Sequence, residues 1–559
     1  MRGLTLAVFC AALAACSGSP TGGSGSSSAS GSGTSAGSSS TSAAASSSSS
    51  AAASGSSSAG STSSSSGSTS GTSGSGSSSS GTSGSGSSSG SSGARCDPAV
   101  DAGSGVVFVN AWYDIPGFPD GGLIAVTAPA APSLFAFSLE LPDGGSQDLL
   151  GTQVSSATQV EIPDVPACAT YWAQLDTTIW IHGSARRIDE GQLHPGLPGA
   201  GQYPANTALD ITVSNVDTSA PASSMFLAVT TASFLQHSVA LTHADGGLLI
   251  QPGASQVEFT TPLAGHPLIQ SDAGDQLVLE ELVSQGGGLR MQQVVSRAWR
   301  VPPTEFAAGT TTFLDGGFAS GTSFGMTLDT SALTGFLADQ PVPAALDPTM
   351  TFEIAASPNA EAYGLTGNNA ILVFANVAST DQDLSALQAA NAFPPSFGPL
   401  AYLTATARDE IPKDDGGTFG FNVTFTRTAL ASDVVGTGFG FQLSPPRSIT
   451  VGGSAANTHV SGLGTRPTLA WNPPSSGTPT AYEVDINQMT AFGTGNTLFK
   501  LYVDGATHSI VLPTGVLTAG STYFFVITAL DASGDITAAP HEPALLRGSA
   551  AAATGFYTP

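Results

Sequence analysis

Residues 517–529 read LTAGSTYFFVITA, a turn of small residues that opens a run of aromatic and β-branched side chains. Two earlier stretches have the same character: 467–471 read PTLAW, and 481–486 read AYEVDI, in which apolar and acidic residues alternate. Alternation with a period of two is typical of a strand with one buried face, and these residue types fit such strands. The three stretches therefore predict an antiparallel β domain over 446–548.

These stretches resemble the B, C and F strands of a fibronectin type III domain. The resemblance implies a core built on Trp471, Tyr482 and Leu517, with Tyr523 as a tyrosine corner that hydrogen-bonds backbone a few residues upstream. Integrin-binding members carry Arg-Gly-Asp in the F–G loop, whereas residues 533–535 here read SGD. The resemblance therefore predicts the fold of this segment and does not transfer that activity.

Upstream of this segment, short apolar runs are separated by Gly, Pro, Asp and Ser. We predict an all-β fold of tandem antiparallel β-sandwiches, immunoglobulin-like, of which the fibronectin type III domain is the last. The predicted parts are a first sandwich over 96–200, a larger β region of one or two units with short helices over 201–445, the fibronectin type III domain over 446–548 and a C-terminal tail over 549–559. Residues 160–171 resemble the last hairpin of prealbumin-like domains.

Asp-Gly pairs recur along the body and predict hairpin turns, because Asp and Gly tolerate the positive φ angles of type I′ turns. They begin at Asp120, Asp143, Asp245, Asp315, Asp415 and Asp504. Residues 331–338 predict a short helix that ends before Pro341. Residues 380–383 have the pattern of a helix capping box, which predicts a second short helix.

The first sixteen residues read MRGLTLAVFCAALAAC, with a positive Arg2, a short apolar stretch and a final Leu-Ala-Ala-Cys. This end matches the lipobox of bacterial lipoproteins, which implies a signal peptide over 1–15 and a lipid on Cys16. Ser17 follows in place of Asp, which favours outer-membrane sorting. Up to residue 95 the chain is almost wholly Ser, Gly, Ala and Thr, a composition that predicts a disordered, flexible stalk. The whole layout is similar to uncharacterised fibronectin type III lipoproteins of Gram-negative bacteria.

The charge and the cysteines narrow the function classes. Acidic residues outnumber basic ones by 40 to 14, and the net charge of −26 argues against nucleic acid as a partner. We expect the membrane as a partner through the lipid, an unidentified protein or glycan ligand, and no cofactor. Cys96 and Cys168 remain for the folded body, where an export compartment favours a disulfide between them. Two separate thiols are the alternative.

Catalytic and metal-binding patterns are weak. Ser323 lies in a G-x-S-x-G pattern, but no alternation of strands and helices surrounds it, and the stalk repeats the pattern at 86–90. We therefore expect no catalytic residue and no metal site. One charged patch stands out in this weakly charged chain and is kept as a candidate site. Its members are His182, Arg186, Arg187, Asp189, Glu190 and His194.

Three functions stay open on the sequence. The first is a membrane-anchored surface lipoprotein whose body is a non-enzymatic binding, adhesion or display module. The second is a periplasmic structural or assembly component, and the third is a tethered hydrolase of extracellular or envelope polymers. A pocket lined by acids, or by aromatic residues such as Trp172 and Trp180, would separate the binding module from the hydrolase. An open aromatic strip would favour binding, and a closed cleft with paired carboxylates would favour catalysis.

Overall fold

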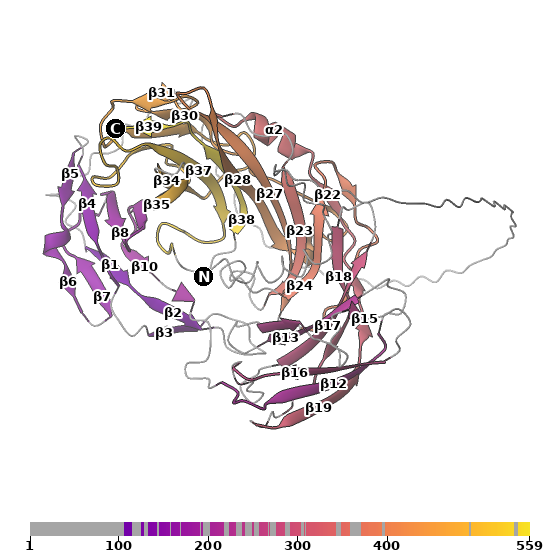
Figure 1. Cartoon of the computed structure of the whole chain (residues 1–559). Coiled ribbons are helices and arrows are strands. Elements are labelled where there is room, and N and C mark those ends of the chain that lie inside the picture. The colour runs from indigo at the N-terminus through magenta and orange to yellow at the C-terminus, as the bar shows by residue number, and fades with distance from the viewer. Residues whose placement is uncertain are drawn as a thin grey trace, which may run out of the picture. The chain divides into compact units, whose positions relative to one another are not determined.

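The computed structural model describes residues 105–114, 124–127, 132–141, 145–156, 158–167, 169–190, 192–193, 202–216, 223–230, 237–240, 249–250, 256–265, 268, 276–285, 291–302, 304, 307, 309–342, 348–357, 370–393, 397–490, 494–540 and 546–559. They belong to one compact unit, Arg95–Pro559. Nearly all of their regular structure is β-strand, which confirms the all-β prediction (Figure 1). Within these ranges the helices are α2 (Ala332–Ala338), α3 (Ala431–Val434) and the 3-10 turn η1 (Leu150–Thr152), and none is long and apolar enough to cross a membrane.

The predictions for the N-terminal part fall on residues beyond those ranges. They concern the signal peptide, Cys16, the stalk over 16–95, and the pair Cys96 and Cys168. All of them therefore stay predictions.

The first sandwich has two sheets, with strand orders β10-β1-β7-β6 and β9-β8-β4-β5. The strands are β1 (Val106–Val109), β4 (Ala136–Glu140), β5 (Ser146–Asp148), β6 (Val154–Ser155), β7 (Gln159–Ile162), β8 (Tyr171–Gln174), β9 (Ile179–Gly183) and β10 (Arg187–Asp189). Phe108, Phe137 and Tyr171 are fully buried between the sheets, and Phe137 stacks on Tyr171 at 4.8 Å between ring centroids. A small sheet, β11-β2-β3, accompanies them: β2 (Ala111–Asp114), β3 (Ile124–Thr127) and β11 (Gln192–Leu193).

The expected prealbumin-like hairpin over 160–171 is corrected by the strand order. β7 pairs with β1 and β6, whereas β8 pairs with β4 and β9 in the other sheet. The segment between them therefore crosses from one sheet to the other. The apolar residues at its two ends, Val160 and Tyr171, enter the same core from opposite sides.

The middle region contains a three-stranded sheet with its own core, a second three-stranded sheet of short strands in the order β25-β22-β29, and the short pair β21-β26. The first sheet is β16-β12-β19, with β12 (Ala208–Ser214), β16 (Gln256–Pro262) and β19 (Thr311–Gly317). The short strands are β21 (Thr322–Ser323), β22 (Thr327–Asp329), β25 (Gln382–Asp383), β26 (Gln388–Ala389) and β29 (Gly438–Gly440). The apolar core on the first sheet is separate from the main one and includes Ile211, Phe259 and Leu279.

The remaining strands of the middle region join one large sheet. They are β13 (Ser223–Thr230), β14 (His237–Ala240), β15 (Leu249–Ile250), β17 (Gln276–Gln285), β18 (Met291–Arg300), β20 (Ala319–Ser320), β23 (Thr349–Ser357), β24 (Ala370–Val377), β27 (Gly398–Pro412) and β28 (Thr418–Leu430). The pairings among them are antiparallel, as in β27 with β28, which keep one register from Leu400 to Pro412.

The C-terminal segment has the two sheets of a fibronectin type III domain. One sheet is β31-β30-β33-β36, with β30 (Arg447–Val451), β31 (Ser454–Ala455), β33 (Thr468–Asn472) and β36 (Ser509–Val511). The other is β35-β34-β37-β38, with β34 (Ala481–Met489), β35 (Gly495–Asp504), β37 (Tyr523–Ala532) and β38 (Leu546–Ala553). Trp471 and Tyr482 come from different sheets and meet edge to face in the core, 5.2 Å between ring centroids.

Both outer strands of the second sheet are paired with strands from elsewhere in the chain. β35 pairs in parallel with β9 of the first sandwich, with Leu501 opposite Trp180. β38 pairs antiparallel with β28 of the middle region, with Phe425 opposite Ala550. Unpaired strand edges invite association with other chains, and these pairings cover both edges of the sheet.

Residues 549–559 belong to the fold rather than to a tail. Their first part completes β38, and their last part contains β39 (Tyr557–Thr558), which pairs in parallel with β32 (Val460–Ser461). Ala550, Ala552, Ala553 and Tyr557 have no exposed surface. The segment is rich in alanine and has few polar residues, a composition that suits both a buried strand and a tail. Composition alone therefore led to the wrong prediction of a tail.

The Asp-Gly turns have mixed outcomes. Asp415 and Gly416 form the predicted hairpin turn between β27 and β28, with Gly416 at φ 83°. Asp504 begins a turn, but the turn leads from β35 to β36 in the other sheet and closes no hairpin. Asp315 lies inside strand β19. The next residue must be Gly, because a Cβ on Gly316 would lie 2.0 Å from Cζ2 of Trp299.

The remaining Asp-Gly turns fall outside the described residues. They begin at Asp120, Asp143 and Asp245. The strands on either side of Asp143, β4 and β5, do pair antiparallel.

One of the two predicted helices is present. The helix predicted over 331–338 is α2. The capping box predicted over 380–383 opens no helix, because Gln382 and Asp383 form β25. Asp381 instead accepts hydrogen bonds from the backbone N–H and the hydroxyl of Ser331, at 2.9 and 3.3 Å, at the start of α2. The acidic side chain therefore caps a helix fifty residues upstream of its own position.

Candidate ligand-binding cleft

Three neighbouring strands of the first sandwich bring aromatic and polar side chains into one row. Ser138 on β4 lies opposite Trp172 on β8, which lies opposite His182 on β9. Side chains alternate between the two faces of a strand, so Glu140 shares the face of Ser138, and Trp180 shares the face of His182. The sequence IWIHG of β9 thus places an indole and an imidazole two residues apart on one side.

The opposite face of the same strands forms the core of the first sandwich. Phe137, Tyr171, Ala173 and Ile181 are fully buried there. Burial of these side chains fixes the register of the three strands, since a shift by one residue would exchange the two faces. The row of polar and aromatic side chains is therefore held in place by the core behind it.

These side chains line a cleft with a cavity volume of about 610 Å³. Its second wall comes from the fibronectin type III domain, where β36 is the outermost described strand of its sheet. The residues that line the cleft are Ala136, Phe137, Ser138, Glu140, Leu141, Gly145, Ser146, Asp148, Trp172, Trp180, His182, Arg466, Ser509, Ile510, Val511, Pro513 and Thr514. Sites for small ligands in proteins have volumes of about 300–1,000 Å³, so the cleft is large enough to hold one.

Glu140 is the charged centre of the cleft. Its Oε2 lies 3.0 Å from Nε2 of His182 and accepts a hydrogen bond of 2.9 Å from the hydroxyl of Thr170. The hydrogen bond with His182 is the main reason why the pKa of the Glu140 carboxyl is lowered. The electrostatic interaction with His182 and smaller contributions from Thr170 and Trp172 add to it, and together they outweigh the opposing effect of partial burial. Glu140 is therefore an ionised hydrogen-bond acceptor at neutral pH, and about 35% of its side chain is exposed.

The indole rings of the two tryptophans have different polar surroundings. Their rings meet edge to face at 6.5 Å, and the ring of Trp172 also lies 4.7 Å from that of His182. Trp172 lies close enough to the Glu140 carboxyl to contribute to the lowering of its pKa. The Nε1 atom of Trp180 is buried and has no hydrogen-bond partner among the described residues. Buried donors are seldom left without a partner, so Trp180 is the indole in this cleft that still lacks an acceptor.

The structure separates the charged patch that the sequence suggested. Among its described members, His182 alone lines the cleft. The guanidinium of Arg186 donates to the backbone carbonyls of Val165 and Pro166. Arg187 is exposed on β10, and the backbone N–H of Asp189 donates to the carbonyl of Ala538. His194 lies outside the described residues.

Glu190, the remaining member, is buried away from the cleft lining. Its side chain is about nine-tenths buried, and burial raises the pKa of its carboxyl to about 8, with a further contribution from the negative charge of Asp176. The patch is thus a set of residues that hold loops together, plus one histidine that faces the cleft.

Glu140, Asp148 and Arg466 were not predicted from the sequence as cleft residues. The signal for Glu140 was present in the alternation of AFSLE on β4, where Ser138 and Glu140 share the polar face. No local sequence pattern predicts Arg466 as a cleft residue, because it belongs to a different domain and lies more than three hundred residues after Glu140 in the chain. Such a residue is found only when both domains are placed together.

The catalytic serine pattern does not form a nucleophile elbow. Ser323 lies in the two-residue strand β21, paired with β26, and its side chain is exposed. A nucleophile elbow requires a sharp turn from a strand into a helix, which is absent at this position. Across the described residues, no group of three or more His, Cys, Asp and Glu side chains could hold a metal ion.

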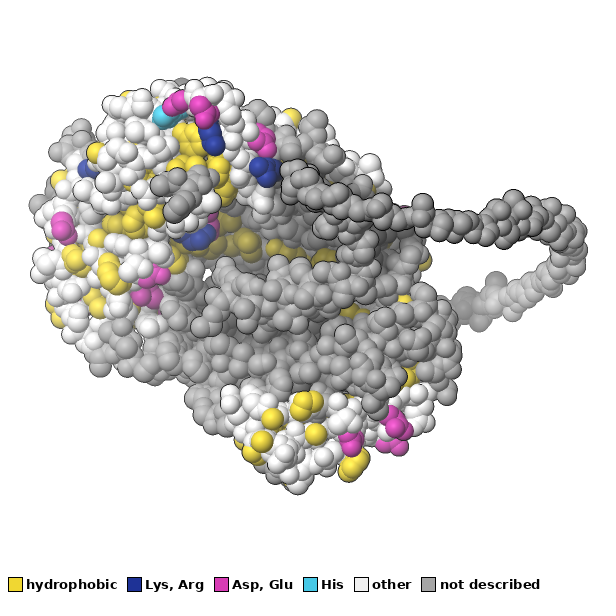
Figure 2. All heavy atoms as spheres, in the orientation of Figure 1, with side chains coloured by type: hydrophobic (Ala, Val, Ile, Leu, Met, Phe, Trp, Pro, Cys, Tyr) yellow, Lys and Arg dark blue, Asp and Glu magenta, His cyan; other side chains and the backbone are white. Residues whose placement is uncertain are grey.

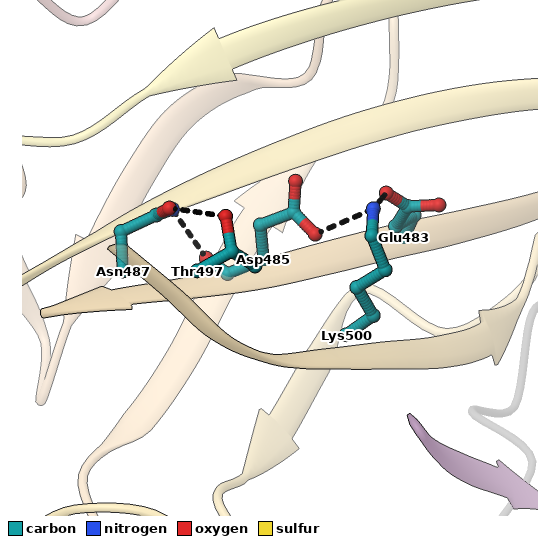
Figure 3. A network of polar contacts seen from close by, with 5 residues as sticks. All are labelled: Glu483, Asp485, Asn487, Thr497 and Lys500. Carbon is teal, nitrogen blue, oxygen red and sulfur yellow. Dashed lines mark hydrogen bonds and ion pairs between the residues drawn. The ribbon is translucent and has the colours of Figure 1, made fainter. Parts of the chain in front are cut away.

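A second polar cluster lies on the fibronectin type III sheet, away from the cleft lining (Figure 3). Glu483, Asp485 and Asn487 share one face of β34, and Lys500 on β35 pairs with both acidic residues. Asn487 accepts a hydrogen bond of 2.8 Å from the hydroxyl of Thr497. Burial and the neighbouring Glu483 raise the pKa of Asp485 to about 7, although Lys500 opposes this shift. The cluster is internally paired and presents no group arranged for a ligand.

Comparisons with known proteins identify no family for this chain. No protein-family model matches it, and no curated protein is similar in sequence. Solved structures of β-domain proteins show weak similarity. The FN1–FN3 domains of chicken CNTN1 share 8% identity, over 59% of this chain and 90% of that chain, with a TM-score of 0.14.

Two further structures give similar values. A Ca²⁺-stabilised, ice-binding adhesin of an Antarctic bacterium shares 11% identity, over 82% of this chain and all of that chain, with a TM-score of 0.14. A tetra-tandem repeat from the extending region of a large adhesion protein shares 10% identity, over 80% and 98% of the two chains, with a TM-score of 0.10. TM-scores this low carry no inference about the function of this chain.

Proposed function

We propose that this chain is a membrane-anchored surface lipoprotein whose β-sandwich body acts as a non-enzymatic binding module. Its ligand site is the cleft between the first sandwich and the fibronectin type III domain. The observation that carries this proposal is the convergence of Trp172, Trp180, His182 and Glu140 with Arg466 around one cavity of about 610 Å³. A concave site with a few oriented polar groups is the usual form of a ligand-binding site.

The state of Glu140 supports binding over hydrolysis. A glycoside hydrolase needs one carboxyl group that keeps its proton near neutral pH, so that it can protonate the leaving group. His182, Thr170 and Trp172 lower the pKa of Glu140 instead, so this carboxyl gives up its proton. An ionised carboxylate that is positioned by His182 and Thr170 is suited to accept hydrogen bonds from a ligand.

The tether supports display at a distance from the membrane. The proposed lipid on Cys16 anchors the chain, and a Ser/Gly stalk of about 75 residues has a root-mean-square reach on the order of 50 Å. The net charge of −26 keeps the body from adsorbing to an anionic envelope. A tethered binder of modest affinity gains avidity when several copies engage one surface.

Display is tested by treating intact cells that express the full chain with proteinase K, beside lysed cells and a Cys16→Ala variant. A nonspecific protease is needed because the chain has only 14 Lys and Arg residues. Loss of the body from intact cells supports the proposal. Protection until lysis overturns the surface location and makes the chain a periplasmic component.

Binding through the cleft is tested by retention of displaying cells on neighbouring cells or on envelope polymers. Ser146→Trp places a large ring in the cleft from the exposed strand β5. Ser454→Trp is the matched control, because Ser454 is exposed on β31 and does not line the cleft. Loss of retention with the first variant and not with the second supports the proposal. Equal retention with both variants places binding elsewhere.

A further inference from the structure

We infer that the ligand of this cleft is an uncharged oligosaccharide, recognised through its hydroxyl groups. The inference rests on the proposed function, whose binding site it shares. It deepens that proposal by naming the chemistry that the cleft selects. Three properties of the lining carry it: the balance of charges, the arrangement of donors and acceptors, and the apolar surface between them.

The balance of charges in the cleft disfavours a highly charged ligand. Two carboxylates, those of Glu140 and Asp148, and one guanidinium, that of Arg466, line the cleft. A polyanion would meet these carboxylates and a body whose formal net charge is −26. On the face shown in Figure 2, the charged side chains that are coloured by type are few and scattered, and they form no continuous track for a charged polymer.

The polar groups of the cleft include both acceptors and donors. The Glu140 carboxylate can accept hydrogen bonds, and Arg466 and the unpaired Nε1–H of Trp180 can donate them. The hydroxyls of Ser138, Ser146 and Thr514 can do either. A sugar hydroxyl also both donates and accepts, so a sugar can satisfy such a mixed lining. An ammonium ion has no acceptor for Arg466, and a phosphodiester has no donor for Glu140.

Apolar side chains lie between these polar groups. Ile510, Val511 and Pro513 line the wall that belongs to the fibronectin type III domain, and 38% of Val511 is exposed. A pyranose ring is polar around its edge and apolar on its C–H faces. The cleft therefore provides contacts for both parts of the ring. Its volume of about 610 Å³ is large enough for more than one sugar unit.

The test uses the full chain with Cys16→Ala, so that the protein is free of lipid while the body is unchanged. It is screened against neutral, acidic and amine-bearing oligosaccharides and against a set of unstructured peptides. The affinity of the strongest ligand is then measured by calorimetry. We expect binding of neutral oligosaccharides, with weaker or no binding of the acidic and amine-bearing sets.

Two substitutions test the contacts, and one serves as a matched control. Glu140→Gln removes the charged acceptor and should weaken binding about tenfold or more, since hydrogen bonds to a charged group are the strong ones. Trp180→Phe keeps an aromatic ring but removes the N–H donor, and should weaken binding several-fold. Trp471→Phe makes the same change at a buried indole that does not line the cleft, and should leave the affinity within about twofold.

Each outcome decides the inference. Selective binding of peptides, or of acidic or amine-bearing oligosaccharides, overturns the ligand class. Neutral binding that is unchanged in Glu140→Gln and Trp180→Phe, and also in Ser146→Trp, overturns the site. If Glu140→Gln unfolds the protein, Ser146→Trp on the exposed strand decides whether the cleft is the site. Retention of cells that persists without any oligosaccharide binding refutes this inference and leaves the proposed function standing.

Discussion

The hydroxyl oxygen of Tyr523 accepts a hydrogen bond of 2.8 Å from the backbone N–H of Thr518. Tyr523 begins strand β37, and Thr518 lies in the turn that precedes it, so the bond ties the turn to the strand that it enters. Leu517 is buried beside them in the same core. This is the contact that the tyrosine corner of a fibronectin type III domain predicts.

Tyr523→Phe should therefore destabilise the protein while keeping its fold. The substitution removes a partly buried hydrogen bond and leaves the backbone N–H of Thr518 without its acceptor, which costs about 0.5–1.5 kcal/mol of unfolding free energy. Urea unfolding followed by tryptophan fluorescence measures the loss. A change below about 0.3 kcal/mol would show that solvent replaces the hydroxyl at this corner.

Two glycines should respond in opposite ways to substitution by alanine. Gly316→Ala drives a Cβ into the ring of Trp299, at 2.0 Å from Cζ2, and should cost about 1–3 kcal/mol. Gly335 lies within helix α2, and no atom lies within 4 Å of the position that a Cβ would take, so Gly335→Ala should stabilise by about 0.5–1 kcal/mol. Thermal melts of both variants beside the wild type test the pair, and two shifts of the same sign would contradict it.

Asp409 should make the stability fall as the pH rises. Asp409 lies fully buried on β27, and burial raises the pKa of its carboxyl to about 7, above the ordinary value of an unfolded chain. Between these two pKa values the folded state holds a proton that the unfolded state has lost, so raising the pH favours unfolding. Asp409→Asn removes this titrating group and should gain roughly 4 kcal/mol of stability relative to the wild type between about pH 4 and pH 8.

The comparison is made by urea unfolding of Asp409→Asn and the wild type across that pH range. The difference in unfolding free energy should grow up to about pH 7 and then level off, because the folded carboxyl titrates there. A difference that stays constant across the range would mean that the buried carboxyl does not titrate in this window.

Lys500 should contribute more to the thermal stability of the protein at alkaline than at acidic pH. It pairs with Glu483 and Asp485, and its charge keeps the pKa of Asp485 from rising above about 7. Without the lysine, burial and Glu483 would raise that pKa further, and the folded state would be penalised over a wider pH range. The melting temperature of Lys500→Met should therefore fall further below that of the wild type at pH 8 than at pH 5. An equal gap at both values would contradict this.

Patterns within single segments were enough to predict the class of the fold. The alternation in AYEVDI and the run YFFVITA predict strands, and β34 and β37 are those strands. Residues 331–338 predict helix α2 because its apolar spacing and its end are both local signals. Local sequence is informative where the buried face repeats with a regular period within one segment, or where the ends of the segment carry local signals.

Errors arose where a residue serves a distant partner. Asp381 has the local appearance of a capping residue, but the helix that it caps lies far upstream. Gly316 has the appearance of a turn residue, but it is a glycine because the ring of Trp299 occupies its side-chain space. The cleft has the same origin, since Glu140 and Arg466 line it from two different domains. The spacing of residues along the chain does not show which distant residues come close together in the folded protein.

The pairing of β35 with β9 and of β38 with β28 has a consequence for how this chain can evolve. Fibronectin type III domains that are joined end to end can be duplicated, shuffled or deleted as whole cassettes, because each keeps its sheets to itself. Here, excision of the last domain would strip hydrogen-bond partners from two other parts of the chain at once. Recombination at the boundaries of the last domain would therefore destabilise the protein and be selected against. The first sandwich, the middle region and the last domain are expected to be inherited together.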